Sequence, residues 1–223
     1  MKKIYLHPLP LRIWHWGNAF LGISLLVTGI QLRLPGIASL QPHSTPLLVH
    51  RYLGWAMAAS FIFWLLYSLI SRHLSRQYGI RRRDLRGVFR QANYYLVSIF
   101  QGAENPFRPT PEEKFNPLQK LAYGAIMCLF APLLVITGVL LNDKLFFREY
   151  ILRWDMVGVL DALHVMGAYV FALYLVVHIY LATLGRTASS HIRAMIVGYE
   201  EEFDDPASAL PVESLRVERE GKG

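Results

Sequence analysis

The sequence predicts an all-α integral membrane protein: a four-transmembrane-helix bundle, N-in/C-in, with a candidate interfacial helix in its cytoplasmic loop. The 223-residue chain is 53% hydrophobic and only 17% charged, whereas about a quarter of the residues in soluble domains carry charge. Four segments contain no charged residue, and each reaches the length of about 20 residues that spans a bilayer. These charge-free segments are residues 13–32, 52–71, 121–142 and 162–185. With a few flanking residues added, they predict helices at about 13–32, 47–71, 118–142 and 160–185.

The positions of lysine and arginine predict the orientation in the membrane. The net charge is +7, and lysine and arginine concentrate before the first helix, between the second and third, and directly after the fourth, at Arg186 and Arg193. Because such residues concentrate in cytoplasmic loops, both termini and the middle loop are expected in the cytoplasm. The same positions make anionic membrane lipid, and not nucleic acid, their expected neighbour.

The connections between the helices differ in character. Within the long loop 72–120, the segment 87–102 mixes aromatic and aliphatic residues with Arg90. It has two interpretations: a helix on the membrane surface, or a helix packed on a partner subunit. Residues 1–200 are expected to form the transmembrane domain. The polar, acidic segment 201–223 is typical of a flexible cytoplasmic tail.

The single cysteine, Cys128, limits the kinds of cofactor and cross-link that the chain can carry. It excludes a disulfide framework and covalent c-type haem, which needs a C-x-x-C-H sequence. Iron–sulfur clusters held by four thiolates are excluded as well. We interpret Cys128 as a small buried apolar residue of the third helix.

A weak internal repeat relates the two halves of the chain. The first helix contains "LLVTGI" and the third "LLVITGV", and each is followed by a helix that opens with a histidine, His50 or His164. The repeat predicts two helix hairpins packed as a four-helix bundle. It does not extend to the other two membrane histidines, His15 and His178.

The predicted orientation places these four histidines at two levels. His15 and His178 (the inner pair) lie toward the cytoplasm, and His50 and His164 (the outer pair) lie toward the opposite face. His164 and His178 are fourteen residues apart on one helix, which separates them by about 21 Å along the axis and points them the same way. They cannot share one metal ion, so each is expected to meet its own centre.

Two imidazoles in an apolar site are the ligands of an electron-transferring b-type haem. A lone membrane histidine is often only a hydrogen-bonded core residue, but two level pairs favour ligation of iron. The pattern therefore predicts two haem b groups. Among the boundary arginines Arg12, Arg33, Arg51 and Arg153, Arg51 directly follows a ligand and is the best candidate for a haem propionate contact; headgroup anchoring is the alternative.

The sequence resembles a known family over residues 5–200. It is similar to the bacterial di-haem cytochrome b membrane subunits of formate dehydrogenase (the gamma subunit), thiosulfate reductase and nickel–iron hydrogenase. The resemblance rests on "HPLPLRIWHWGNAF", "VHRYLGW", "KFNPLQKLAYG" and the fourth-helix histidines spaced by fourteen. It implies the same two histidine pairs and a location in the bacterial cytoplasmic (inner) membrane.

The resemblance also implies a quinone site beside the inner haem, for menaquinone or ubiquinone. The candidate residues are Asn116, Gln119 and Lys120 in "FNPLQK". They can donate hydrogen bonds to a quinone carbonyl near a supply of protons. The alternative is a helix N-terminus, with Asn116 as its cap and Pro117 in its first turn.

The predicted function is that of a membrane-anchoring di-haem cytochrome b subunit of a respiratory oxidoreductase. It would pass electrons between the quinone pool and a partner subunit that carries iron–sulfur, molybdenum, nickel–iron or multihaem centres. No catalytic residue of its own is predicted. The alternatives are a stand-alone cytochrome b that reduces ferric iron or oxidises superoxide, and a non-haem membrane protein that binds metal or anchors a complex.

Overall fold

The computed structural model describes residues 3–34, 44–70, 82–107, 115–142, 148–184 and 187–201. Apart from Glu201, the predicted tail lies outside these residues. Contacts divide the chain into two compact units: Ile13–Leu181, and Met1–Arg12 with Ala182–Gly223. Most described residues are helical, and the prediction of an all-α protein with four membrane-spanning helices is confirmed.

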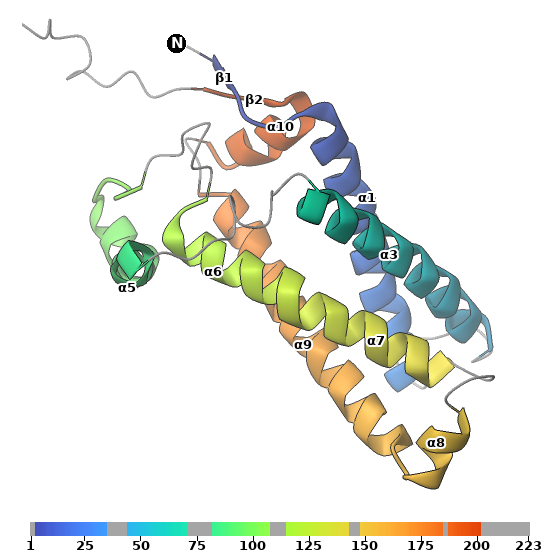
Figure 1. The fold of residues 1–223 in the computed structure, drawn as a ribbon. Helices are drawn as coiled ribbons and strands as arrows, with labels where there is room; N and C mark the ends of the chain where they lie inside the picture. Colours follow the sequence, from blue (N-terminus) through green and yellow to red (C-terminus); the bar gives the residue numbers. More distant parts are fainter. Residues whose placement is uncertain are drawn as a thin grey trace, which may run out of the picture. The chain divides into compact units, whose positions relative to one another are not determined.

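Four long helical segments pass through the larger unit in alternating directions (Figure 1). They are α1 (Leu9–Arg33), α3 (Ser44–Ile70), the segment made by α6 (Pro117–Ala125), η2 (Ile126–Phe130) and α7 (Ala131–Asn142), and α9 (Val157–Ala182). Each is long and apolar enough to cross a membrane. The first begins earlier than predicted, with prolines in and before its first turn, where the missing amide hydrogen costs little. This start places His15 a turn deeper in the helix than the charge pattern indicated.

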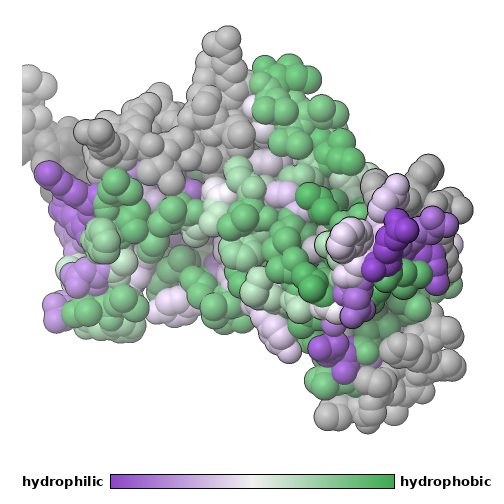
Figure 2. Space-filling view, turned by 60° about the horizontal axis from the view of Figure 1, so that its bottom comes forward, coloured by the Kyte–Doolittle hydropathy of each residue, from purple (hydrophilic) through white to green (hydrophobic). Residues whose placement is uncertain are grey.

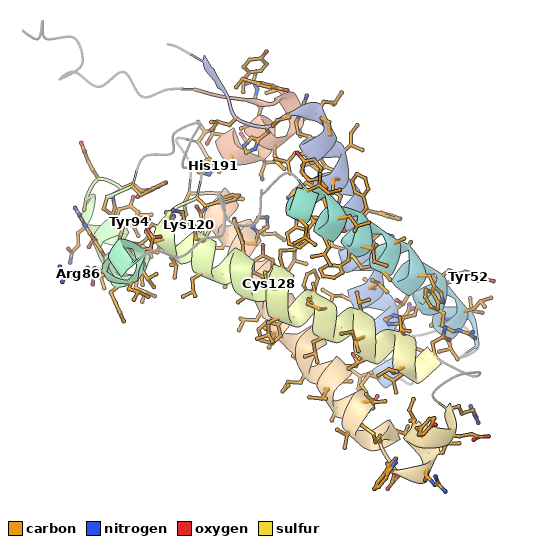
Figure 3. All side chains as sticks on the ribbon, viewed as in Figure 1. Tyr52, Arg86, Tyr94, Lys120, Cys128 and His191 are labelled. Carbon is orange, nitrogen blue, oxygen red and sulfur yellow. The ribbon has the colours of Figure 1, made fainter. Side chains whose placement is uncertain are left out.

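The third span is interrupted by a proline. Pro132 has no amide hydrogen to donate, and the helix widens into the π-helical turn η2 immediately before it. The amide of Ala131 accordingly donates to the carbonyl of Ile126, five residues earlier. Cys128 lies in this turn and is exposed (Figure 3), so the prediction that it is buried is wrong.

Small and polar residues bring the spans together. A methyl group added at Gly22 on α1 would lie 3.0 Å from Phe171 on α9, and one at Gly167 would lie 3.1 Å from Leu134 on α7. Small residues of this kind let membrane helices approach closely. Asn18 on α1 and Ser60 on α3 exchange hydrogen bonds of 2.9 and 3.1 Å.

The outer surface of the spans is apolar. Large side chains such as Phe20, Leu66, Tyr169 and Val176 are more than half exposed, whereas the buried set includes several polar residues. On the face shown in Figure 2, hydrophobic residues cover the middle and hydrophilic residues gather toward the ends. An apolar exterior of this extent is expected where lipid, not water, surrounds the helices.

The middle loop contains the helix α5 (Arg82–Leu96), followed by the 3₁₀ turn η1 (Ser98–Gln101). The helix begins five residues before the predicted segment 87–102 and lies beside the start of α6 (Figure 1). A methyl group at Gly87 would lie 2.6 Å from the ring of Pro117, so the two helices are in close contact. A short helix, α8 (Arg148–Arg153), precedes α9.

In the smaller unit, the two ends of the described chain meet in a structure that the sequence analysis did not predict. Strand β1 (Lys3–Tyr5) pairs antiparallel with β2 (Tyr199–Glu201), and α10 (Ser190–Val197) precedes β2. Gly198 ends α10 with a φ of 93°, a backbone conformation that favours glycine. The guanidinium of Arg12 donates to the carbonyl of Ile196.

Candidate functional site

The structure brings the four membrane histidines together as the two predicted pairs. The rings of His15 on α1 and His178 on α9 have centroids 6.1 Å apart. Those of His50 on α3 and His164 on α9 lie 6.3 Å apart. The fourth span therefore contributes one histidine to each pair.

The ring separations suit one metal ion between each pair. A metal–imidazole nitrogen bond is about 2 Å long, and a ring nitrogen lies about 1.1 Å from its own centroid. Two imidazoles on opposite sides of one ion therefore have centroids about 6.2 Å apart, close to both observed values. The donor sets consequently fit an iron with two axial histidines.

In the outer pair, a threonine contacts each histidine. The hydroxyl of Thr28 on α1 lies 2.8 Å from Nδ1 of His50, and that of Thr137 on α7 lies 2.9 Å from Nδ1 of His164. The glycine after each threonine faces the same ring. A methyl group at Gly29 would lie 3.6 Å from Cε1 of His50, and one at Gly138 would lie 3.2 Å from Cε1 of His164.

Aromatic rings surround the inner pair. Tyr174, one turn before His178 on α9, stacks on its ring at 5.6 Å with 19° between the planes. Tyr123 on α6 meets the same ring edge-on at 6.1 Å. Trp16 lies edge-on to His15 at 5.2 Å. The two pairs thus have different surroundings: threonine and glycine at the outer pair, aromatic rings at the inner one.

The boundary arginines are placed differently from one another. Arg33 pairs with Asp161 at 3.2 Å, with both side chains largely exposed, and Arg12 is bonded to Ile196. Arg51 is half-buried next to His50 and forms no ion pair with any residue that the structure describes.

The predicted quinone residues form the N-terminus of α6. The Asn116 side chain accepts from the amide of Gln119 at 2.8 Å, and the Gln119 side chain accepts from the amide of Asn116 at 3.1 Å. This reciprocal arrangement is a capping box, so Asn116 caps the helix as predicted, with or without a quinone contact. A quinone contact at the same residues stays a prediction.

A buried polar cluster links this cap to α5. Lys120 lies on the side of α6 that meets α5 (Figure 3), and its ammonium is 3.8 Å from the carboxylate of Asp84. Both side chains are less than a tenth exposed. The side-chain NH₂ group of Asn116 donates to the hydroxyl of Tyr95 at 3.2 Å. Burial raises the pKa of the Tyr95 phenol, although hydrogen bonds with Gln91, Asn116 and Asn105 oppose this shift.

Sequence reasoning missed several of these residues. Thr28 and Thr137 lie inside the repeated "LLVTGI" and "LLVITGV" segments. The repeat predicted two hairpins but not the contacts of these threonines. A threonine–glycine pair at matching positions opposite two candidate ligands was the available signal. Asp84 and Tyr95 lie outside the repeated segments and carried no comparable signal.

Comparisons with known proteins identify the family of the chain. Residues 6–198 match the family model for prokaryotic cytochrome b561. The putative cytochrome YdhU of Escherichia coli is 32% identical over 205 residues, which cover 89% of this chain and 75% of that protein. A probable Ni/Fe-hydrogenase B-type cytochrome subunit of Bradyrhizobium diazoefficiens is 28% identical, covering 91% of this chain and 87% of that protein.

A protein of Rhodobacter capsulatus with the same description is 26% identical over 230 residues, covering 91% of this chain and 83% of that protein. The family match spans nearly all of the described residues, including all four paired histidines. The chain therefore belongs to the prokaryotic cytochrome b561 family, as a multi-pass membrane cytochrome that carries haem b and transfers electrons.

Proposed function

We propose that this protein is the membrane-anchoring di-haem subunit of a respiratory oxidoreductase, and that it passes electrons between a membrane quinone and a partner redox subunit. His15 and His178 would ligate the inner haem, and His50 and His164 the outer one. The main support is the pair of facing imidazoles at each of two levels, 6.1 and 6.3 Å between centroids. When bound, each haem supplies an iron that changes its charge by one electron.

The number of protein ligands at each level supports haem over a bare metal ion. Among the residues that the structure describes, no group of three or more histidine, cysteine, aspartate or glutamate side chains gathers as a metal site. A structural or catalytic zinc ion needs three or four protein ligands. A porphyrin supplies four nitrogens of its own, so two axial histidines complete the coordination of its iron.

Arg51 is proposed to hold a propionate of the outer haem. It follows His50 directly, is half-buried, and has no carboxylate partner among the described residues. A guanidinium forms two parallel hydrogen bonds with a carboxylate, which fixes the carboxylate's orientation as well as its charge. Arg33 is less suited to this role, because Asp161 already neutralises it.

A quinone is proposed to bind at the start of α6, beside the inner pair. Tyr123, one turn after Lys120 on α6, contacts the ring of His178, so this helix connects the candidate quinone residues with the inner pair. The side-chain oxygen of Gln119 is used in the capping box. Its NH₂ group remains the donor best suited to a quinone carbonyl, and Lys120 is less available because it is paired with Asp84.

The partner is proposed to carry the centre that reacts with the soluble substrate. Two relatives are described as B-type cytochrome subunits of Ni/Fe hydrogenases, which supports a nickel–iron partner; iron–sulfur, molybdenum and multihaem partners remain alternatives of the same kind. We place the chain in the bacterial inner membrane with both termini in the cytoplasm, on the positive-inside rule. The partner would then contact the outer end.

The exposed face of α5 supports its placement at the membrane surface. Leu85, Phe89 and Leu96 are each more than half exposed, whereas the polar Asp84 and Gln91 are buried against the rest of the unit. A helix on a water-exposed surface has the opposite arrangement, with polar side chains exposed and apolar side chains buried. Arg86 and Arg90 accompany the exposed apolar side chains, as in helices that bind anionic lipid.

The first test is a dithionite-reduced minus oxidised visible spectrum of the purified protein, with haem quantified per chain. We expect two b-type haems, one of which is lost in His50→Ala and the other in His178→Ala. His191→Ala, a histidine of α10 outside both pairs, is the matched control and should retain both haems.

A well-folded protein without haem would overturn the assignment of the histidines, and one haem per chain would overturn the di-haem stoichiometry.

The quinone site needs a separate test. Gln119→Leu should slow oxidation of the reduced haems by a water-soluble menaquinone analogue at least tenfold, with both haems still bound. An unchanged rate would move the quinone site elsewhere.

A further inference from the structure

The hydrogen bonds of Thr28 and Thr137 favour one tautomer of each outer histidine, the one with its proton on Nδ1. The hydroxyl of Thr28 lies 2.8 Å from the carbonyl of Ser24, and that of Thr137 is 2.6 Å from the carbonyl of Leu133. A carbonyl oxygen can only accept, whereas Nδ1 of histidine can donate or accept according to its tautomer. Both bonds of a threonine therefore form together only when its hydroxyl donates to the backbone. The hydroxyl oxygen then accepts a proton from Nδ1 of the histidine.

The tautomer that results is the one that iron needs. With the proton on Nδ1, the other ring nitrogen, Nε2, keeps its lone pair and can ligate a metal. Both threonines are buried, at 8% and 2% exposure, so water does not compete strongly for these bonds. The arrangement occurs twice, on α1 toward α3 and on α7 toward α9.

The glycine that follows each threonine provides space for the ring that the threonine holds. At Gly138 an added methyl group would be only 3.2 Å from Cε1 of His164, and at Gly29 the corresponding distance to His50 is 3.6 Å. The two Thr–Gly dipeptides thus act on the outer pair in the same manner. The inner pair has a different environment, in which Tyr174 and Tyr123 pack on His178.

We propose that Thr28 and Thr137 are positioning residues of the outer haem, which hold its two histidines with Nδ1 protonated and lower the potential of that haem. The inference rests on the proposed ligation by His50 and His164. A hydrogen-bond acceptor on Nδ1–H makes the imidazole a stronger base, and a stronger base favours the more highly charged ferric iron. The threonines would thereby make the two haems unequal.

The test replaces each threonine by valine, which has nearly the same shape but no hydroxyl, and by serine, which keeps the hydroxyl. The midpoint potential of each haem is measured by redox titration, and the outer haem is identified as the one missing in His50→Ala. Thr28→Val and Thr137→Val should raise the potential of the outer haem and change its low-spin ferric EPR signal. A tenfold change in the equilibrium between ferric and ferrous haem shifts the midpoint potential by about 59 mV.

Thr28→Ser and Thr137→Ser should keep the potential and the EPR signal of the outer haem as they are in the unmodified protein. The potential of the inner haem should stay the same in all four variants. A second measurement needs no haem. In the haem-free protein, ¹⁵N shifts of the imidazoles should show His50 and His164 protonated at Nδ1, and the valine variants should lose this preference.

The outcomes separate this inference from the function on which it depends. If the histidine variants keep both haems, the ligation itself is wrong. If the histidine variants lose haem but the valine variants leave the potential, the EPR signal and the ¹⁵N shifts unchanged, only the role of the threonines is overturned. A valine variant that shifts both haems equally would indicate a general structural effect and would also overturn it.

Discussion

Single residues set the clearance around the outer histidines as well as their hydrogen bonds. Gly29 and Gly138 occupy the same place in the two repeats, yet a methyl group added at Gly138 would lie 3.2 Å from the ring of His164, whereas one added at Gly29 would lie 3.6 Å from the ring of His50. A carbon–carbon contact of 3.6 Å is ordinary van der Waals packing. One of 3.2 Å requires the ring to move, and His164 is also held by Thr137.

This difference predicts unequal effects of the same substitution. Gly138→Ala should displace the His164 ring and reduce occupancy of the outer haem by at least half, because an axial ligand tolerates little displacement. Gly29→Ala should have a clearly smaller effect. Haem content per chain and the reduced-minus-oxidised spectrum measure both. Equal losses in the two variants would contradict the prediction.

At the scale of elements, the junction between α5 and α6 joins the cytoplasmic loop to the third span. It combines the close approach of Gly87 to Pro117, the hydrogen bond from Asn116 to Tyr95 and the ion pair of Asp84 with Lys120. Because these polar groups lie between helices whose exposed faces are apolar, they specify where α5 docks. The start of α6, and the quinone residues proposed there, depend on this junction.

The buried ion pair leads to a prediction about stability. Lys120→Met leaves the carboxylate of Asp84 without the cation 3.8 Å away, and removal of one partner of a buried pair costs about 3–5 kcal/mol. Asp84→Asn in the same chain should recover most of the loss, because no buried charge remains. Thermal unfolding of the protein in detergent measures the effect.

Arg86→Met is the control for that experiment. Arg86 is an exposed arginine on the same helix (Figure 3), and exposed substitutions usually change stability by less than about 0.5 kcal/mol. If Lys120→Met is as mild as Arg86→Met, or if Asp84→Asn adds a further loss, the ion pair does not hold the junction together.

At the scale of the whole molecule, four spans place two histidine pairs at different depths. α9 contributes to both pairs, and its two histidines are about 21 Å apart along the helix axis. In the proposed di-haem function, electrons moving between the two levels would cross most of the apolar core, which is about 30 Å thick. The side on which each pair lies decides whether that transfer works with or against the membrane potential.

The predicted orientation can be measured by cysteine labelling. In a Cys128→Ser background, Glu149→Cys on α8 should react with a membrane-impermeant maleimide in intact cells, because α8 is expected on the outer side. Gln101→Cys at the end of η1 should react only after the membrane is permeabilised. Both positions are exposed. The reverse labelling pattern would invert the assignment of inner and outer pairs.

Much of this architecture follows from the order of residues alone. Spans are predictable because hydrocarbon must satisfy every backbone group within the helix, so the apolar stretches identify them directly. Helix periodicity places His164 and His178 on one face, and the alternation of spans brings them level with His50 and His15. The cap at Asn116 is equally local, since its bonds join residues three positions apart.

Other features depended on packing between elements that are distant in the chain. The bonds of Thr28 with His50 and of Thr137 with His164 join residues 22 and 27 positions apart, and the sequence contains no rule for the rotation of one helix against another. The pairing of Asp84 with Lys120 depends in the same way on how α5 docks. The sequence by itself determined the spans and the levels of the histidines, because burial in lipid acts along each helix separately. Only the tertiary structure decided which side chains hold the histidine rings, because those contacts depend on the approach of one helix to another.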